Sequence, residues 1–167
     1  FYLMMYNEAL PMPARPAHEA LDEGVVRGGY LLEPAAGDGP RVNLLGSGTI
    51  LFEVMQAAET LREEGYSVSV YSITSYIELA RDAERAEQAD ADPAWLDTIF
   101  PETDVPIVAA TDYVRALPRM IASWINGPFM ALGTDGFGMS ERRSDLRAHF
   151  KVDAASIADV ARKLTAR

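Results

Sequence analysis

Two short apolar runs, each of which stops at a Thr-Asp pair, most constrain what this chain can fold into. The first reads IVAATDY over residues 107–113, and the second reads FMALGTDGFG over residues 129–138. Runs of this kind are typical of buried parallel strands, whose carboxyl ends deliver polar loops to one edge of a sheet. Because ligands and partners of open α/β sheets bind at that edge, we expect both Thr-Asp pairs to lie there.

The rest of the chain alternates strand-like and helix-like segments. Four strand-then-helix units follow one another from Arg41 onward, which predicts right-handed crossovers and helices on both faces of a parallel sheet. We therefore expect a three-layer α/β domain whose mostly parallel sheet has about five strands, one of them an antiparallel edge strand. The expected strands are 30–33, 41–45, Ser67–Ile73, 106–110 and Phe129–Leu132. The expected helices are 19–26, 50–64, 74–87, 94–100, one that ends near residue 125, 141–150 and Ala154–Thr165.

Turn-forming residues add detail to this scheme. The stretch PAAGDGP at 34–40 predicts that strands 30–33 and 41–45 pair antiparallel at one edge. Gly65 stands where a helix end favours a left-handed residue, and Ser75 or Thr74 can cap the next helix. Pro118 should delay or kink the helix that ends near residue 125.

The first sixteen residues differ in character from the rest. Residues 1–6 are apolar and could pair as a strand, whereas three prolines in 7–16 block both helix and sheet ladder. We interpret 1–16 as a linker from an upstream domain and 17–167 as the domain itself. Since the chain opens without Met, we expect a piece of a longer polypeptide.

Composition excludes several classes of partner and site. With 15 Lys and Arg against 25 Asp and Glu, the formal net charge of −10 opposes binding to nucleic acid or to an anionic membrane surface. The absence of cysteine excludes disulfides, thiolate catalysis and Cys-type zinc sites, and is consistent with a reducing compartment, the cytoplasm. No apolar run approaches the ~20 residues that span a bilayer, and the start lacks the basic leader of a signal peptide.

The turn Gly46-Ser47-Gly48-Thr49 joins a strand to a helix and could hold a phosphate or an ion. It lacks the Lys of a P-loop and the third Gly of a dinucleotide fingerprint. A tight structural turn with a Ser or Thr cap is therefore the favoured interpretation.

Asp112 and Asp135 follow the two Thr-Asp strand ends and could form a carboxylate pair that binds a metal or shares a proton. The simpler hypothesis is that each caps the helix or turn that follows it. His18 and His149 are the only histidines, and neither lies beside a nucleophile motif. His149 follows Asp145 by four residues, which favours a surface pair.

Arg142, Arg143 and Arg147 form the one notable basic cluster of an acidic chain. Such a cluster could dock a carboxylate or an acidic partner surface. A solvated helix face is the favoured alternative.

Taken together, these segments resemble the C-terminal, transketolase-like domain of the homodimeric bacterial-type pyruvate dehydrogenases, the thiamine-diphosphate-dependent decarboxylating components. The resemblance covers almost the whole chain, in the order of the family. The segments that carry it are FYLMMYNEALPMPA, EGVVRGGYLLE, VNLLGSGTILFEVMQAAETL, VYSITSYIELARDAER, VAATDYVRALPRMI and MALGTDGFGMSERRSDLRAHFKVD.

The resemblance implies a domain that follows two larger ones, which bind thiamine diphosphate and Mg²⁺ at the dimer interface. The intact enzyme then decarboxylates a 2-oxo acid and transfers the acyl group to a lipoyl group. It implies no catalytic, cofactor or metal ligand on this segment, which would be inactive alone. Its roles would be packing on the upstream domains, homodimerisation, and contact with the active-site approach or the dihydrolipoyl acetyltransferase core. The contact candidates are Asp112, Thr134, Asp135, Arg142 and Arg143.

Two departures from the family pattern stand out. After TDGFG the family carries Arg-Ser-Asp, where this chain has Met139-Ser140-Glu141. Residues 86–93 read AEQADADP in place of a Trp-Asn…Leu-His-Pro stretch. These differences leave open a divergent paralogue that acts on another 2-oxo acid or a ketose, or a non-catalytic assembly or binding module.

Overall fold

The computed structural model describes residues 9–17, 20–89 and 93–166. Its five-stranded sheet has the order β1-β3-β2-β4-β5, in which β1 runs antiparallel to β3 and all other neighbours are parallel. This arrangement confirms the predicted fold class. The strands are β1 (Gly29–Glu33), β2 (Arg41–Gly46), β3 (Ser67–Ile73), β4 (Ile107–Ala110) and β5 (Phe129–Leu132).

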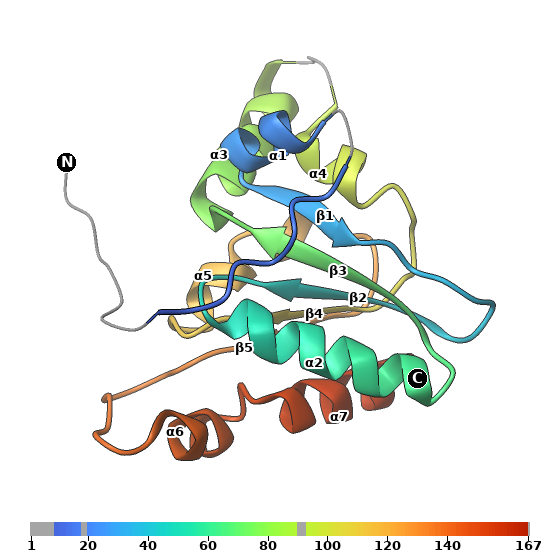
Figure 1. Ribbon diagram of the computed structural model, residues 1–167. Coiled ribbons are helices and arrows are strands. Elements are labelled where there is room, and N and C mark those ends of the chain that lie inside the picture. Colours follow the sequence, from blue (N-terminus) through green and yellow to red (C-terminus); the bar gives the residue numbers. More distant parts are fainter. Residues whose placement is uncertain (1–8, 18–19, 90–92, 167) are drawn as a thin grey trace.

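Helices cover both faces of the sheet (Figure 1). One face packs against α2 (Ile50–Glu63) and α7 (Ala154–Thr165), with α6 (Arg143–Phe150) beside them. The other face packs against α3 (Tyr76–Ala89) and α4 (Trp95–Ile99), with α1 (Leu21–Arg27) next to them. No helix in the described ranges is long and apolar enough to cross a bilayer.

Two adjacent leucines of strand β2 serve opposite faces of the sheet. Leu44 packs into the core under α2 and α7, whereas Leu45 packs into the core under α3 and α4. Both side chains are fully buried. Successive residues of a strand point to opposite faces, so a strand covered on both sides has no polar face to alternate with.

The predicted antiparallel pair of 30–33 with 41–45 is wrong, because β1 pairs with β3 instead. Strand β2 lies in the centre of the sheet, where β3 and β4 occupy both of its edges. A fully buried strand gains most from this central place. The half-exposed β1 pairs with the outer edge of β3, where Gly29 lies opposite Ile73.

The predicted helix to residue 125 is also wrong. The chain forms one turn, α5 (Ala116–Arg119), and then a separate 3₁₀ turn at Ala122–Trp124. Pro118 is the third residue of α5. The first N–H groups of a helix have no partner within the helix, so the missing N–H of a proline costs nothing there, and the helix can begin only shortly before Pro118. Helix α6 likewise begins at Arg143 rather than at 141.

Other local predictions are confirmed. Gly65 follows α2 with a φ of +88°, and the Ser75 hydroxyl accepts the backbone N–H of Glu78 at 3.1 Å at the start of α3. Residues 9–17 form neither helix nor strand. Residues 1–8 lie outside the described residues, so the strand at 1–6 and the division at 16 stay predictions.

Asp82 joins the three helices of the α3 face. Its carboxylate accepts the first backbone N–H of α4, from Trp95, at 2.6 Å. It also accepts hydrogen bonds from Arg27 of α1, at 2.9 Å, and from Arg85 of α3. The Arg27 guanidinium lies 4.9 Å from the centroid of the Trp95 ring. Charge-assisted bonds of this kind are among the stronger hydrogen bonds in proteins, so we expect Asp82 to fix how these helices pack.

Candidate functional site

The strand order reverses at the carboxyl ends of β2 and β4. From β2 the chain crosses through α2 to β3 on one side, and later returns to β4 on the other side. Here the Ser47 hydroxyl donates to the Thr111 hydroxyl at 2.8 Å, and the Ser47 N–H donates to the Ala110 carbonyl at 3.3 Å. Open α/β sheets bind ligands at such a switch point.

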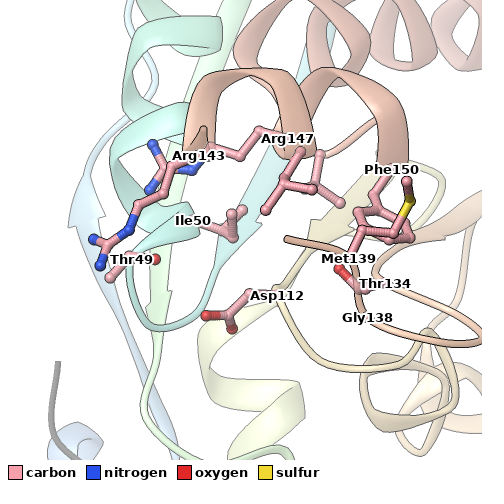
Figure 2. Close-up of a pocket in the computed structure, with 11 residues that line it drawn as sticks. Thr49, Ile50, Asp112, Thr134, Gly138, Met139, Arg143, Arg147 and Phe150 are labelled. Carbon is pink, nitrogen blue, oxygen red and sulfur yellow. The ribbon is translucent and has the colours of Figure 1, made fainter. Parts of the chain in front are cut away.

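A cavity of about 240 Å³ lies at this switch point, between α2 and α6. Asp112 lies at its floor and two arginines reach it from α6 (Figure 2). The side chains of Thr49, Ile50, Asp112, Arg143, Arg147 and Phe150 line it. An apolar cavity with a few converging polar groups is the usual form of a small-molecule site.

Glu53 holds the elements around this cavity together. One carboxylate oxygen accepts a hydrogen bond from Arg147 of α6 at 2.7 Å, and the other accepts the Ala154 N–H that begins α7, at 2.9 Å. Both charged side chains are largely shielded from solvent. Asp153 stands at the N-cap position of α7, but its side chain makes no capping bond. Glu53 therefore supplies the carboxylate that accepts an N–H at the start of this helix.

The two Thr-Asp loops are tied to each other. The Thr134 N–H donates to the Tyr113 carbonyl at 2.8 Å. Asp135 accepts the backbone N–H of Arg115 at 2.9 Å and its guanidinium at 2.7 Å, and these bonds hold the pKa of the Asp135 carboxyl below its ordinary value. A Cβ on Gly133 would lie 2.5 Å from the Tyr113 carbonyl oxygen, so this close approach requires glycine.

Residues 28–153 match the family model of the transketolase-like TK C-terminal domain. The chain belongs to this family.

Relatives and solved structures agree with this assignment. The pyruvate dehydrogenase E1 component of Corynebacterium glutamicum is 39% identical over 166 residues, which are 94% of this chain and 18% of that protein. The same component of Escherichia coli K12 is 39% identical over 164 residues, with the same coverage of both chains. The transketolase of Leishmania mexicana shares the fold, with a TM-score of 0.61 and 24% identity over 87% of this chain and 19% of that one. This transketolase-like C-terminal domain thus spans about a fifth of the length of the curated relatives it matches.

The structure separates the five contact candidates into two groups. Asp112, Thr134 and Arg143 line the cavity of this transketolase-like domain. Asp135 is bonded to Arg115 instead, and Arg142 is exposed at the start of α6. Over the described ranges, no three His, Cys, Asp or Glu side chains are grouped to hold a metal ion. Contact roles for these five residues stay predictions.

Two of the capping predictions at this edge need correction. Thr49 stands at the N-terminus of α2 but makes no side-chain capping bond. Its own backbone is already helical, with a φ of −73° and a ψ of −17°, whereas a capping residue is normally extended. Asp135 caps the segment after β4, at Arg115, rather than the loop that follows it. The second correction has a tertiary cause, since parallel strands bring together loops that are distant in sequence.

Two histidine predictions have different outcomes. His18 lies outside the described residues. His149 packs edge-on against the Phe150 ring, with ring centroids 4.9 Å apart, and no bond to Asp145 is seen in the part of the chain that the structure describes. The divergent stretch at 86–93 continues α3 as far as Ala89 and then reaches 90–92, which also lie outside the described residues.

Sequence reasoning missed the apolar side chains at this edge of the transketolase-like domain. Phe137 is 97% exposed and Met139 is 56% exposed, on the loop between β5 and α6. Tyr113, Val114 and Met120 are also exposed, on the neighbouring connection after β4. The signal was present in the sequence, since Gly136 and Gly138 flank Phe137 and leave its side chain no local support. We call these five residues the apolar edge.

Proposed function

We propose that this chain is the C-terminal domain of a thiamine-diphosphate-dependent pyruvate dehydrogenase. The intact enzyme would decarboxylate the 2-oxo acid and pass the acyl group to a lipoyl group. Identity of 39% to the E1 components of two bacteria, over 94% of this chain, supports the proposal. In such enzymes the chemistry belongs to the cofactor, and the protein supplies orientation and electrostatics.

Thiamine diphosphate and Mg²⁺ belong to the upstream domains in this proposal. A magnesium ion that bridges phosphates requires several oxygen ligands in near-octahedral geometry. Asp112 is the one acidic side chain in the cavity at the switch point, and the described residues group no three potential ligands. The residues present do not fit the cofactor, and in this proposal the segment takes no part in the catalytic step.

The apolar edge carries the proposal for the role of this domain. Five of the ten large apolar side chains exposed in the described ranges belong to these two connections. Exposed apolar clusters of this kind mark interaction sites. The bond from Thr134 to Tyr113 and the Arg115–Asp135 ion pair hold the two loops in one arrangement. The edge is therefore preorganised to dock another surface.

We take the upstream region of the same enzyme as the partner of this edge, because the relatives are about five times as long as this chain. Burying Phe137 and Met139 would give that contact its hydrophobic centre, with arginines at its rim. In the intact enzyme, a cytoplasmic homodimer, Arg142 and Arg143 would face the active-site approach or the acetyltransferase core.

Reversing both charges, in the double variant Arg142→Glu/Arg143→Glu, should weaken assembly more than cofactor binding. Assembly is measured by light scattering after mixing with the upstream portion, and cofactor affinity by calorimetric titration of thiamine diphosphate. Arg81→Glu/Lys163→Glu is the matched control, because both residues form only exposed surface pairs on other helices. Equal assembly of the two double variants, or a loss of cofactor affinity as large as the loss of assembly, would contradict the proposal.

A further inference from the structure

We propose that the cavity between α2 and α6 binds a free α-amino acid with an apolar side chain. The inference goes beyond the proposed function and does not depend on it. It rests on the position, the size, the apolar walls and the two opposite charges of this cavity.

The position and size suit a small molecule. The cavity opens at the switch point of the sheet, where α/β proteins bind ligands. Its volume of about 240 Å³ corresponds to roughly eight water molecules at the ~30 Å³ that each occupies in the liquid. A complete nucleotide is too large for this space, whereas a single amino acid fits it.

The walls are mostly apolar. Ile50 of α2 and Val152, which follows α6, form one part of the lining. Leu146 and Phe150 of α6 and Met139 of the preceding loop complete the apolar part of the lining. Burying an aliphatic or aromatic ligand side chain against them would supply the hydrophobic part of the binding energy.

Two opposite charges determine the class of ligand. Asp112 lies at the floor, after β4, and Arg143 approaches from α6 on the opposite side (Figure 2). A simple carboxylate would meet the negative charge of Asp112, and a simple amine would meet the arginines of α6. A zwitterion can present its ammonium to Asp112 and its carboxylate to Arg143. These new contacts would either add to or replace the contacts that the two side chains already make.

The start of α2 adds polar groups on the carboxylate side. Thr49 is only 6% exposed, lines the cavity and makes no capping bond to its own helix. The positive end of the α2 dipole lies at the same place, where it favours a carboxylate. Arg147, which also lines the cavity, is engaged with Glu53 and so serves to hold α6 over the site.

The test starts with the unaltered chain. Isothermal titration calorimetry and amide chemical-shift mapping with L-leucine, L-methionine and L-phenylalanine should show saturable binding, with shifts around Thr49, Asp112 and α6. The analogues 4-methylpentanoate, which lacks the ammonium, and 3-methylbutylamine, which lacks the carboxylate, should each bind about tenfold or more weakly than leucine. Absence of binding by all three amino acids at millimolar concentration, or equal binding by either analogue, would overturn the proposal.

Single substitutions test which charged group of the ligand each side chain contacts. Asp112→Asn should weaken leucine binding more than it weakens binding of 4-methylpentanoate, whereas Arg143→Gln should weaken both. Arg142→Gln is the matched control, because this neighbouring arginine does not line the cavity. Leucine affinities that are the same in all three variants would contradict the assignment. If circular dichroism shows that a variant does not fold, the comparison of leucine with its two analogues on the unaltered chain still decides whether the cavity prefers a zwitterion.

Discussion

Replacing Asp82 with alanine should lower the free energy of unfolding by about 2–4 kcal/mol, as expected for removing a largely shielded charge that accepts several hydrogen bonds. The Asp82 side chain is only 10% exposed. Its loss leaves the Trp95 N–H at the start of α4 without this acceptor, and leaves Arg27 without this partner. Urea denaturation followed by circular dichroism measures the change. Glu84→Ala, an exposed carboxylate on the same helix, is the matched control and should change stability by under about 0.5 kcal/mol.

The same side chain predicts a pH dependence. Burial favours the neutral form of Asp82, but hydrogen bonds from Trp95 and Arg27 and the nearby positive charges outweigh it, so the pKa of this carboxyl lies below its ordinary 3.8. A lowered folded-state pKa adds stability above the unfolded value, and this stability is lost as the pH falls through the folded value. The stability gap between the wild type and Asp82→Asn should therefore be full near neutral pH and shrink below pH 3.8. A gap that stays constant with pH would show that the charge of Asp82 contributes nothing.

Replacing Phe137 with serine should weaken association with the upstream portion roughly 30-fold, about 2 kcal/mol, the cost of removing an aromatic anchor from the centre of an interface. Phe137 is 97% exposed, so the stability of the isolated chain should not change. An apolar side chain that is exposed in this way adds no buried area to the domain and so contributes nothing to its stability. Calorimetric titration of the upstream portion into the wild type and the variant gives the two affinities.

Val26→Ser is the control for this experiment. Val26 is 77% exposed on α1, on the other side of the sheet from α2, and belongs to neither loop of the apolar edge. Its replacement should leave the affinity for the upstream portion unchanged. Equal weakening by both substitutions, or no weakening by Phe137→Ser, would mean that the apolar edge is not the docking surface.

The sequence predicts the central part of the fold because local and global signals agree there. The apolar residues of β2, the amphipathic α2 and Gly65 after it all favour one β-α-β unit, and the structure has it. The partner of β1 could not be derived in the same way. Proximity along the chain favours a hairpin with β2, whereas burial decides that β2 takes the centre and β1 the edge of β3.

The site is less predictable, because its contacts join distant parts of the chain. The sequence placed Asp112 and Thr134 at one edge of the sheet, and both line the cavity. The Arg115–Asp135 ion pair joins two loops, and Glu53 contacts residues about a hundred positions away. No local pattern encodes these pairs, since they arise only once parallel strands set their carboxyl ends side by side.

In the function proposed above, this domain completes a larger cofactor-dependent enzyme. Light scattering coupled to size-exclusion chromatography, on the chain alone and mixed with the upstream portion, tests it most directly when followed by thiamine-diphosphate titration. We expect that the chain alone binds no thiamine diphosphate and that the mixture forms a dimer that binds it. A chain that stays monomeric in the presence of the upstream portion would contradict the proposed function, and an independent binding module would then describe this protein better.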